Sequence, residues 1–254
     1  GYVVDSTTLF ADRDEGGIAL STSWYTAEQR TRHEISAATT HYAEKQNGAK
    51  STREDGVKGS YSISHALDDQ TIKDSDKIVT AELGGYRDKN SSGDGNNRSG
   101  QYVAGEFYQA WSQRDIFSVG IKRATHSKFK SSTDWKLSSS KGLGQTSAAI
   151  LFDAGTGVTH PSYSEINGNA SWGITGNANL VPEQNNSLSI GVKFSRDKTA
   201  DYQRVVGFNE LLKNEILYVS SGSTYANETS TSRRRSFEID GTVALDSAER
   251  CGAH

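Results

Sequence analysis

The stretch LSIGVKFS (residues 188–195) alternates at every position between apolar residues and polar or small ones. The apolar set is Leu188, Ile190, Val192 and Phe194, and the other set is Ser189, Gly191, Lys193 and Ser195. A side-chain period of two is typical of a β-strand with one dry face and one wet face. The stretch FEIDGTVAL (residues 237–245) repeats the pattern. Both stretches therefore predict strands whose two faces meet different surroundings.

Alternation of the same kind runs through much of the chain. It marks five further segments: Gly59 to Leu67, Lys77 to Arg87, Gln101 to Trp111, Ile116 to Thr125 and Asn169 to Leu180. Helical periodicity is scarce. The best helical candidate is Asn209 to Ile216 (NELLKNEI), a segment that equally fits a strand and its turn.

Segments of suitable length number about twelve to fourteen, and strands of about ten residues with their loops fill the chain. We therefore predict an all-β fold, a single antiparallel up-and-down β-barrel formed by one domain over residues 1–254. Cys251 to His254 (CGAH) are expected to be a tail outside that fold.

The predicted connections fall into two kinds. Four are long, polar and rich in Gly, Asn or Ser: Glu44 to Gly56, Asp88 to Gly100, Ser131 to Gly144 and Ser220 to Arg235. Glu28 to Arg32 and Ser112 to Asp115 are much tighter. Short turns at one end and long polar loops at the other are typical of membrane β-barrels.

Composition excludes several classes of protein. A net charge of −3 argues against a nucleic-acid partner, and a single Cys cannot form an internal disulfide. Only 2 Pro residues interrupt the chain, which suits long hydrogen-bonded strands. The chain has no stretch of 18 apolar residues, so no transmembrane helix is predicted. The absence of Met favours a processed or trimmed chain, from which a secretory signal peptide would already be gone.

In its alternation, its polar loops and its few prolines, the chain resembles Gram-negative outer-membrane β-barrels of the porin type. The resemblance implies a protein in the bacterial outer membrane whose partners are the lipid bilayer and small polar solutes. Its expected function is that of a channel or export pore with a charged lumen. The residues expected to line the pore are Glu82, Glu106, Lys122, Lys193, Glu238 and Asp240.

Alternation alone does not say whether the apolar faces point to lipid or to a buried core. The alternative is therefore a secreted, extracellular β-sandwich that recognises a glycan or a host surface through its long loops.

Signatures of chemistry are weak. No G-x-S-x-G motif and no Cys pair occur, so we expect no enzyme activity and no cofactor. Asp88, Asn90 and Ser92 match the opening of a calcium loop before Gly93, but the twelfth position holds Ser99 instead of Glu. These three residues are a weak calcium-loop candidate, and a solvated hairpin loop explains them more simply.

Overall fold

The computed structural model describes residues 11–46, 49–90, 97–144, 146–169, 173–195 and 202–242. The strands of its large sheet are β1 (Ala11–Thr26), β2 (Thr31–Gln46), β3 (Ala49–Ala66), β4 (Lys77–Asn90), β5 (Arg98–Ala110), β6 (Ile116–His126), β7 (Ser132–Gly142), β8 (Ala148–Thr159), β11 (Glu183–Ser195), β12 (Tyr202–Lys213) and β15 (Ser232–Thr242). The remaining elements are α1 (Tyr163–Asn167), β9 (Gly168–Asn169), β10 (Ile174–Thr175), β13 (Ile216–Val219), a short 3₁₀ turn (Ser220–Gly222) and β14 (Thr224–Asn227).

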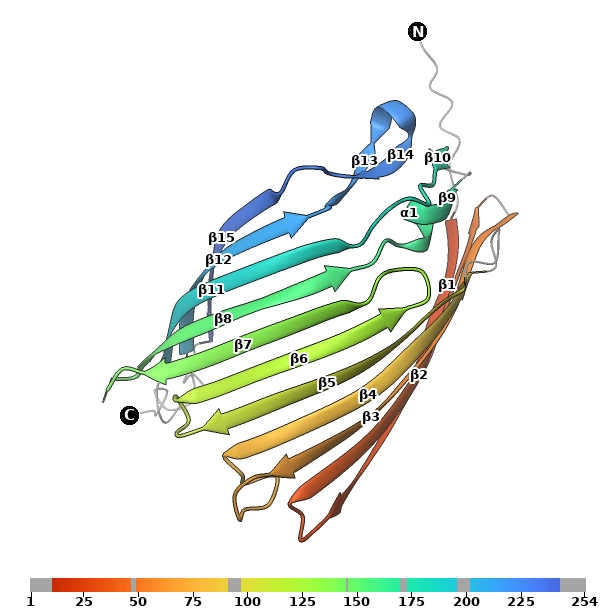
Figure 1. Cartoon of the computed structure of the whole chain (residues 1–254). Coiled ribbons are helices and arrows are strands. Elements are labelled where there is room, and N and C mark those ends of the chain that lie inside the picture. The colour runs from red at the N-terminus through yellow and green to blue at the C-terminus, as the bar shows by residue number, and fades with distance from the viewer. Residues whose placement is uncertain are drawn as a thin grey trace, which may run out of the picture.

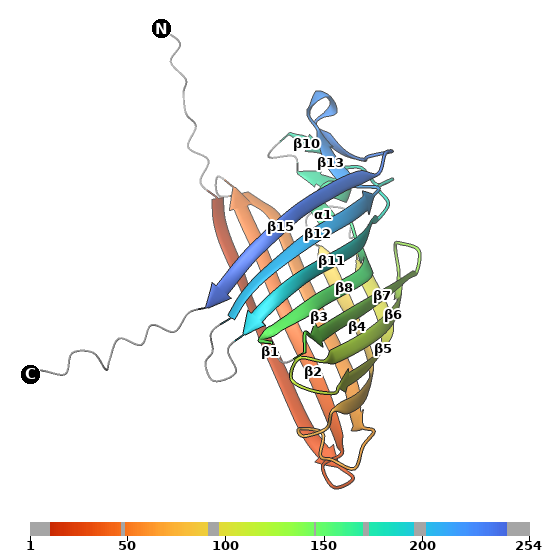
Figure 2. The same cartoon turned by 90° about the vertical axis from the view of Figure 1, so that its left-hand side faces the viewer.

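Eleven strands form one sheet in the order β1-β2-β3-β4-β5-β6-β7-β8-β11-β12-β15. Every neighbouring pair is antiparallel, so the chain runs up and down across the sheet, which curves through space (Figure 1, Figure 2). The predicted all-β, up-and-down architecture is confirmed. Strands β1 and β15 are the two edges of the sheet, and within the described residues they do not pair with each other.

One face of this sheet is apolar and exposed. Leu83 is 59 % exposed, Ile190 61 % and Phe237 75 %. A sandwich would bury these side chains in its core, and a membrane barrel presents them to lipid. The exposure therefore contradicts the alternative of a soluble β-sandwich.

The opposite face is polar and more crowded. Ser118 and Ser189 lie on it and are only 9 % and 8 % exposed, although no second sheet of comparable size covers them in the described part of the chain. Side chains converge on the inner side of a curved sheet and diverge on its outer side. The polar face is therefore the concave one.

The sequence misplaced several segments. Strand β7 lies within a predicted loop, because its sequence STDWKLSSSKG offers only Trp135 and Leu137 as apolar residues. Hydrogen bonding to β6 and β8 on either side holds such a polar segment extended. Most of the predicted loop at residues 44–56 also belongs to strands, β2 and β3.

Two further segments were assigned the wrong element. The candidate helix at residues 209–216 is the end of β12 and the start of β13, with Asn214 in a left-handed turn between them at φ 56°. The strand predicted over residues 169–180 is replaced by two short strands, β9 and β10, at which the chain leaves the large sheet. This detour is one reason why the large sheet has eleven strands and not the predicted number.

We predict that Leu83→Arg, in the middle of β4, weakens folding into lipid bilayers by about 2–4 kcal/mol, because it places a charge at the depth of the hydrocarbon. The matched control is Glu82→Arg, one position along the strand and on the polar face, which should cost far less. Urea titration of the protein in lipid vesicles measures both. Equal losses for the two variants would contradict the assignment of the faces.

Candidate functional site

Two long connections meet at one end of the large sheet. The connection from β8 to β11 carries α1, β9 and β10, and the connection from β12 to β15 carries β13 and β14. These four strands form a small sheet in the order β13-β14-β10-β9. Asn227 joins the two connections, since its amide donates to the carbonyl of Val181 (2.9 Å) and accepts from the Val181 N–H (2.9 Å). We call this end of the sheet the loop end.

The short helix α1 is fixed by its first turn. Ser162 caps it, accepting from the backbone N–H of Glu165, while the Glu165 carboxylate accepts from the backbone N–H of Ser162 (2.6 Å). This reciprocal arrangement is a capping box, which the sequence SYSE encodes. It holds the buried Tyr163 against the large sheet, where the tyrosine hydroxyl donates to the carbonyl of Asp88 (3.2 Å).

Arg98, the first residue of β5, is held against this helix. Its guanidinium lies 3.7 Å from the centre of the Tyr163 ring and donates from one nitrogen to the carbonyl of Pro161 (2.6 Å). The other terminal nitrogen is buried and has no hydrogen-bond partner. A buried guanidinium N–H without a partner is costly, and an anionic group would satisfy it.

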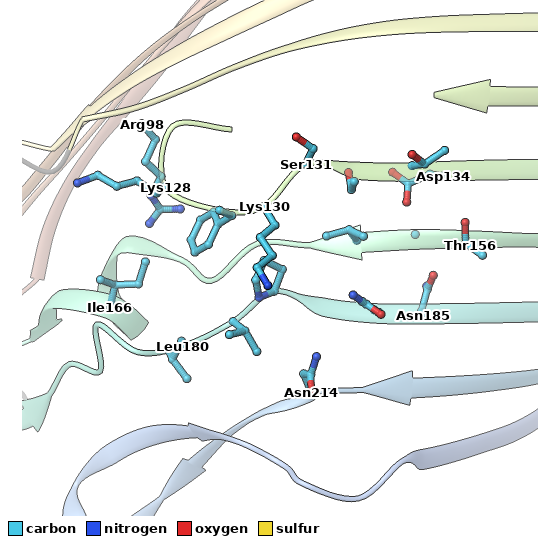
Figure 3. A pocket seen from close by; sticks show the side chains of 18 of the residues that line it. Arg98, Lys128, Lys130, Ser131, Asp134, Thr156, Ile166, Leu180, Asn185 and Asn214 are labelled. Atoms are coloured by element: carbon cyan, nitrogen blue, oxygen red, sulfur yellow. The ribbon is translucent and has the colours of Figure 1, made fainter. Parts of the chain in front are cut away.

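Next to Arg98 lies a cavity of about 770 Å³ (Figure 3), a size within the range of small-molecule sites. Its polar lining combines three cations with one carboxylate and several amides: Arg98, Lys128, Lys130, Asp134, Gln184, Asn185, Asn186 and Asn214. Phe129, Tyr163, Ile166 and Leu180 add apolar surface. An excess of positive charge with many amide donors favours an anionic, oxygen-rich ligand.

The six residues predicted to line a pore all lie on the polar, concave face of the large sheet: Glu82, Glu106, Lys122, Lys193, Glu238 and Asp240. Residues paired across strands share a face, and so do residues two apart along a strand. The pairing extends this face from Glu82 and Lys122 across β7 and β8 to Lys193. Their role in lining a pore remains a prediction, and the shared face supports it.

Several of these side chains have partners that the sequence did not indicate. The Tyr102 hydroxyl donates to Glu82 (2.5 Å), and the Lys122 ammonium lies 4.3 Å from the centre of the Tyr102 ring. Lys136 forms an ion pair with Glu106 (3.5 Å). Alternation along β5 placed Tyr102 on this face, but no local signal reveals which residue it contacts across strands.

Arg204 is the main residue that sequence reasoning missed. It donates to Asp240 (Nε to Oδ2, 2.8 Å) and to Glu238 (3.2 Å), so one guanidinium holds both predicted carboxylates. Reading the end of β12 as a possible helix hid the strand to which Arg204 belongs.

The calcium-loop candidate is not brought together as a loop in the described structure. Asp88 and Asn90 are residues of strand β4, and Ser92 lies outside the described residues. In the described ranges, no group of three or more His, Cys, Asp or Glu side chains is arranged to hold a metal ion. None of the helices described here is long and apolar enough to cross a membrane.

Taken together, an up-and-down sheet with an exposed apolar face and a polar concave face defines an outer-membrane β-barrel. The family model for TonB dependent receptor-like β-barrels matches residues 2–249, and the chain belongs to this family. The predicted location in the Gram-negative outer membrane is confirmed. The porin-type resemblance was right about the membrane barrel, but the matching family is that of TonB-dependent receptors.

Solved structures share the fold at low sequence identity. The siderophore receptor PirA from Pseudomonas aeruginosa has a TM-score of 0.75 and 15 % identity, over 95 % of this chain and 46 % of its own. The hemophore receptor HasR from Serratia marcescens, in complex with its hemophore and heme, has a TM-score of 0.66 and 12 % identity, over 93 % and 47 %. The copper transporter OprC has a TM-score of 0.61 and 12 % identity, over 92 % and 43 %.

The chain thus spans less than half the length of these three structures. The comparison with curated proteins finds no match.

We predict a pH dependence at the loop end. Burial, reinforced by the neighbouring His126 and Arg98, lowers the pKa of His160 from 6.5 to about 4. The folded chain therefore favours neutral His160, whereas the unfolded segment takes up a proton below pH 6.5. The contribution of neutral His160 to the stability of the folded chain is therefore complete above pH 6.5 and is lost as the pH falls toward 4.

Hydrogen exchange of residues 160–169, compared at pH 7.5 and pH 5 after correction for intrinsic rates, measures this effect. Protection should fall at the lower pH in the native protein, and His160→Gln should remove most of the change. An undiminished pH effect in the Gln variant would assign the titration to another group.

Proposed function

We propose that this chain forms part of an outer-membrane transporter that captures an anionic, metal-chelating solute in the loop-end pocket. The observation that carries the proposal is the charge of that pocket, with three cations and one carboxylate among its lining residues. Arg98 contributes a buried N–H group without a partner, held in place by Tyr163 and Pro161. Such preorganised donors bind anions at low entropic cost.

The long loops point to the side of the membrane from which the solute arrives. In outer-membrane barrels the short turns are periplasmic and the long loops extracellular. The pocket lies among the long connections, so it faces the exterior. A site there is suited to capture from outside the cell and therefore to uptake more than to export.

A complete transporter requires a closed wall. Strands β1 and β15 each have a free edge in the described sheet, and lipid leaves no water to satisfy edge N–H and C=O groups. Further strands must therefore pair with both edges. Barrels of twenty-two strands are found in plugged outer-membrane transporters, and the eleven strands here are half that number.

The similar structures support the class of solute. Their names refer to siderophores, heme and copper, and a ferric enterobactin receptor is among them. A siderophore is the candidate that best fits an anion-binding pocket with many amide groups. The family description further implies dependence on TonB as a partner.

Passive passage of small polar solutes is a second candidate. The charged lumen predicted for it exists as a polar face, but several of its cations are paired with carboxylates, as Arg204 is with Asp240 and Glu238. In the pocket, three cations accompany a single carboxylate among the lining residues. We therefore favour capture in the pocket over selection along the lumen.

The test uses a Gram-negative host that lacks its own siderophore receptors and expresses the protein. We expect Lys128→Glu combined with Lys130→Glu to weaken binding of ferric enterobactin, an anionic probe, by about tenfold or more, because charge-assisted contacts are worth roughly 1.5–3 kcal/mol each. Binding to whole cells of ⁵⁵Fe-labelled probe gives the affinity.

The matched control is Lys73→Glu, which reverses a charge in the connection between β3 and β4 at the opposite end of the sheet. A neutral ferric hydroxamate of similar size serves as the second probe. Equal loss with the control variant, or no loss in the double variant for a probe that does bind, would overturn the pocket as the capture site.

A further inference from the structure

Two histidines that are far apart in the sequence meet beside the loop-end pocket. His126 is the last residue of β6, and His160 follows β8. Their ring centres are 3.9 Å apart with an angle of 56° between the ring planes. The Phe129 ring also contacts His160, with ring centres 4.9 Å apart. Strand β7 separates β6 from β8 in the sheet, so this contact is made by the chain folding over at the loop end.

Both rings have an unsatisfied nitrogen. The Nε2 atoms of His126 and His160 are buried and have no hydrogen-bond partner. His33 shows the usual situation, since one ring nitrogen contacts the Thr26 hydroxyl (3.0 Å) and the other the Tyr61 hydroxyl (2.7 Å). Buried polar atoms without partners are exceptions that an ion or a water molecule commonly explains. Two such atoms on rings in contact point to one shared ligand.

Tyr86 orients the first of these rings. Its hydroxyl lies 3.0 Å from Nδ1 of His126. Gly100, on the strand between them, makes this contact possible, because a Cβ there would lie 2.5 Å from the Tyr86 ring. When the tyrosine oxygen accepts a hydrogen bond from the Nδ1–H group, Nε2 carries no proton and its lone pair is free to bind a metal. Metal-binding histidines typically have such a partner on the other nitrogen.

The neighbouring cations are Arg98 beside His160 and Lys122 beside His126. Imidazole nitrogen as a ligand suits zinc, copper and nickel. The same positive charges oppose a cation, so the affinity is expected to be moderate. Two imidazoles also leave coordination positions open for water or for donors of another molecule.

We propose that His126 and His160 bind one transition-metal ion through their Nε2 atoms, at a site that Tyr86 orients. With metal–nitrogen distances of about 2.0–2.1 Å and tetrahedral geometry, the two ring centres would lie about 5 Å apart, so the rings separate by about 1 Å on binding. The inference does not depend on the proposed uptake of an anionic solute, because it concerns binding of a metal ion alone.

Isothermal titration calorimetry of the purified protein in detergent with ZnCl₂ tests the site. We expect one binding event in the native protein, with the affinity reduced at least about tenfold in His126→Ala and in His160→Ala. Tyr86→Phe should weaken binding by a smaller factor, since it removes only the orienting contact. His33→Ala is the matched control and should bind as the native protein does.

Electron paramagnetic resonance with Cu²⁺ gives a readout that a purely structural role would not change. The native protein and His33→Ala should show coupling to two nitrogen nuclei, and either single variant at the site should lose one of them. Absence of zinc and copper binding in the native protein would overturn the proposal and leave a bridging water as the explanation. Unchanged two-nitrogen coupling in both site variants would overturn it equally. If the protein fails to take up the anionic solute while the two-nitrogen coupling persists, only the proposed function is refuted.

Discussion

The structure depends on one constraint, the need of every backbone N–H and C=O group to find a partner where no water is available. Antiparallel pairing from β1 to β15 meets it for the nine inner strands, and the alternation of side chains follows from the same pairing. Because the backbone hydrogen bonds lie in the plane of the sheet, each side chain points to one face of the sheet or to the other. Apolar residues such as Leu83 occupy the outer face, and Glu82 beside it occupies the inner one. In the described sheet, β1 and β15 each have one edge without a neighbouring strand.

On the concave face, contacts between strands depend on small residues. Tyr86 lies across Gly100, and Tyr102 lies over Gly84, where added Cβ atoms would come within 2.5 and 2.6 Å of the tyrosine rings. In each case a glycine on one strand lets an aromatic ring from the next strand cross it. The rings then carry hydroxyl groups to His126 and to Glu82. Polar contacts therefore form across strands without interrupting the backbone pairing.

The sequence predicts the part of this structure that depends on local pattern. The alternation from Leu188 to Phe194 predicts both the strand and its two faces, because alternation is a local consequence of backbone geometry. Strand β7 escaped prediction because its neighbours, not its own residues, keep it extended. The pocket could not be predicted for another reason. Arg98 and Pro161 are 63 residues apart, and no local pattern in the sequence indicates that they are in contact. Polar-face residues could thus be predicted individually, whereas their partners, such as Arg204 for Asp240, required the register.

The hydrogen bonds of Asn227 and Asn177 tie together two connections that are separate in the sequence. Asn227 spans from Val181 to Asn214, and Asn177 donates to the carbonyl of Tyr225 (2.8 Å). A change in the length of one connection must therefore be tolerated by the other. The loop end is thus built as one paired unit, and a segment replaced in one connection alone would lose its hydrogen bonds to the other.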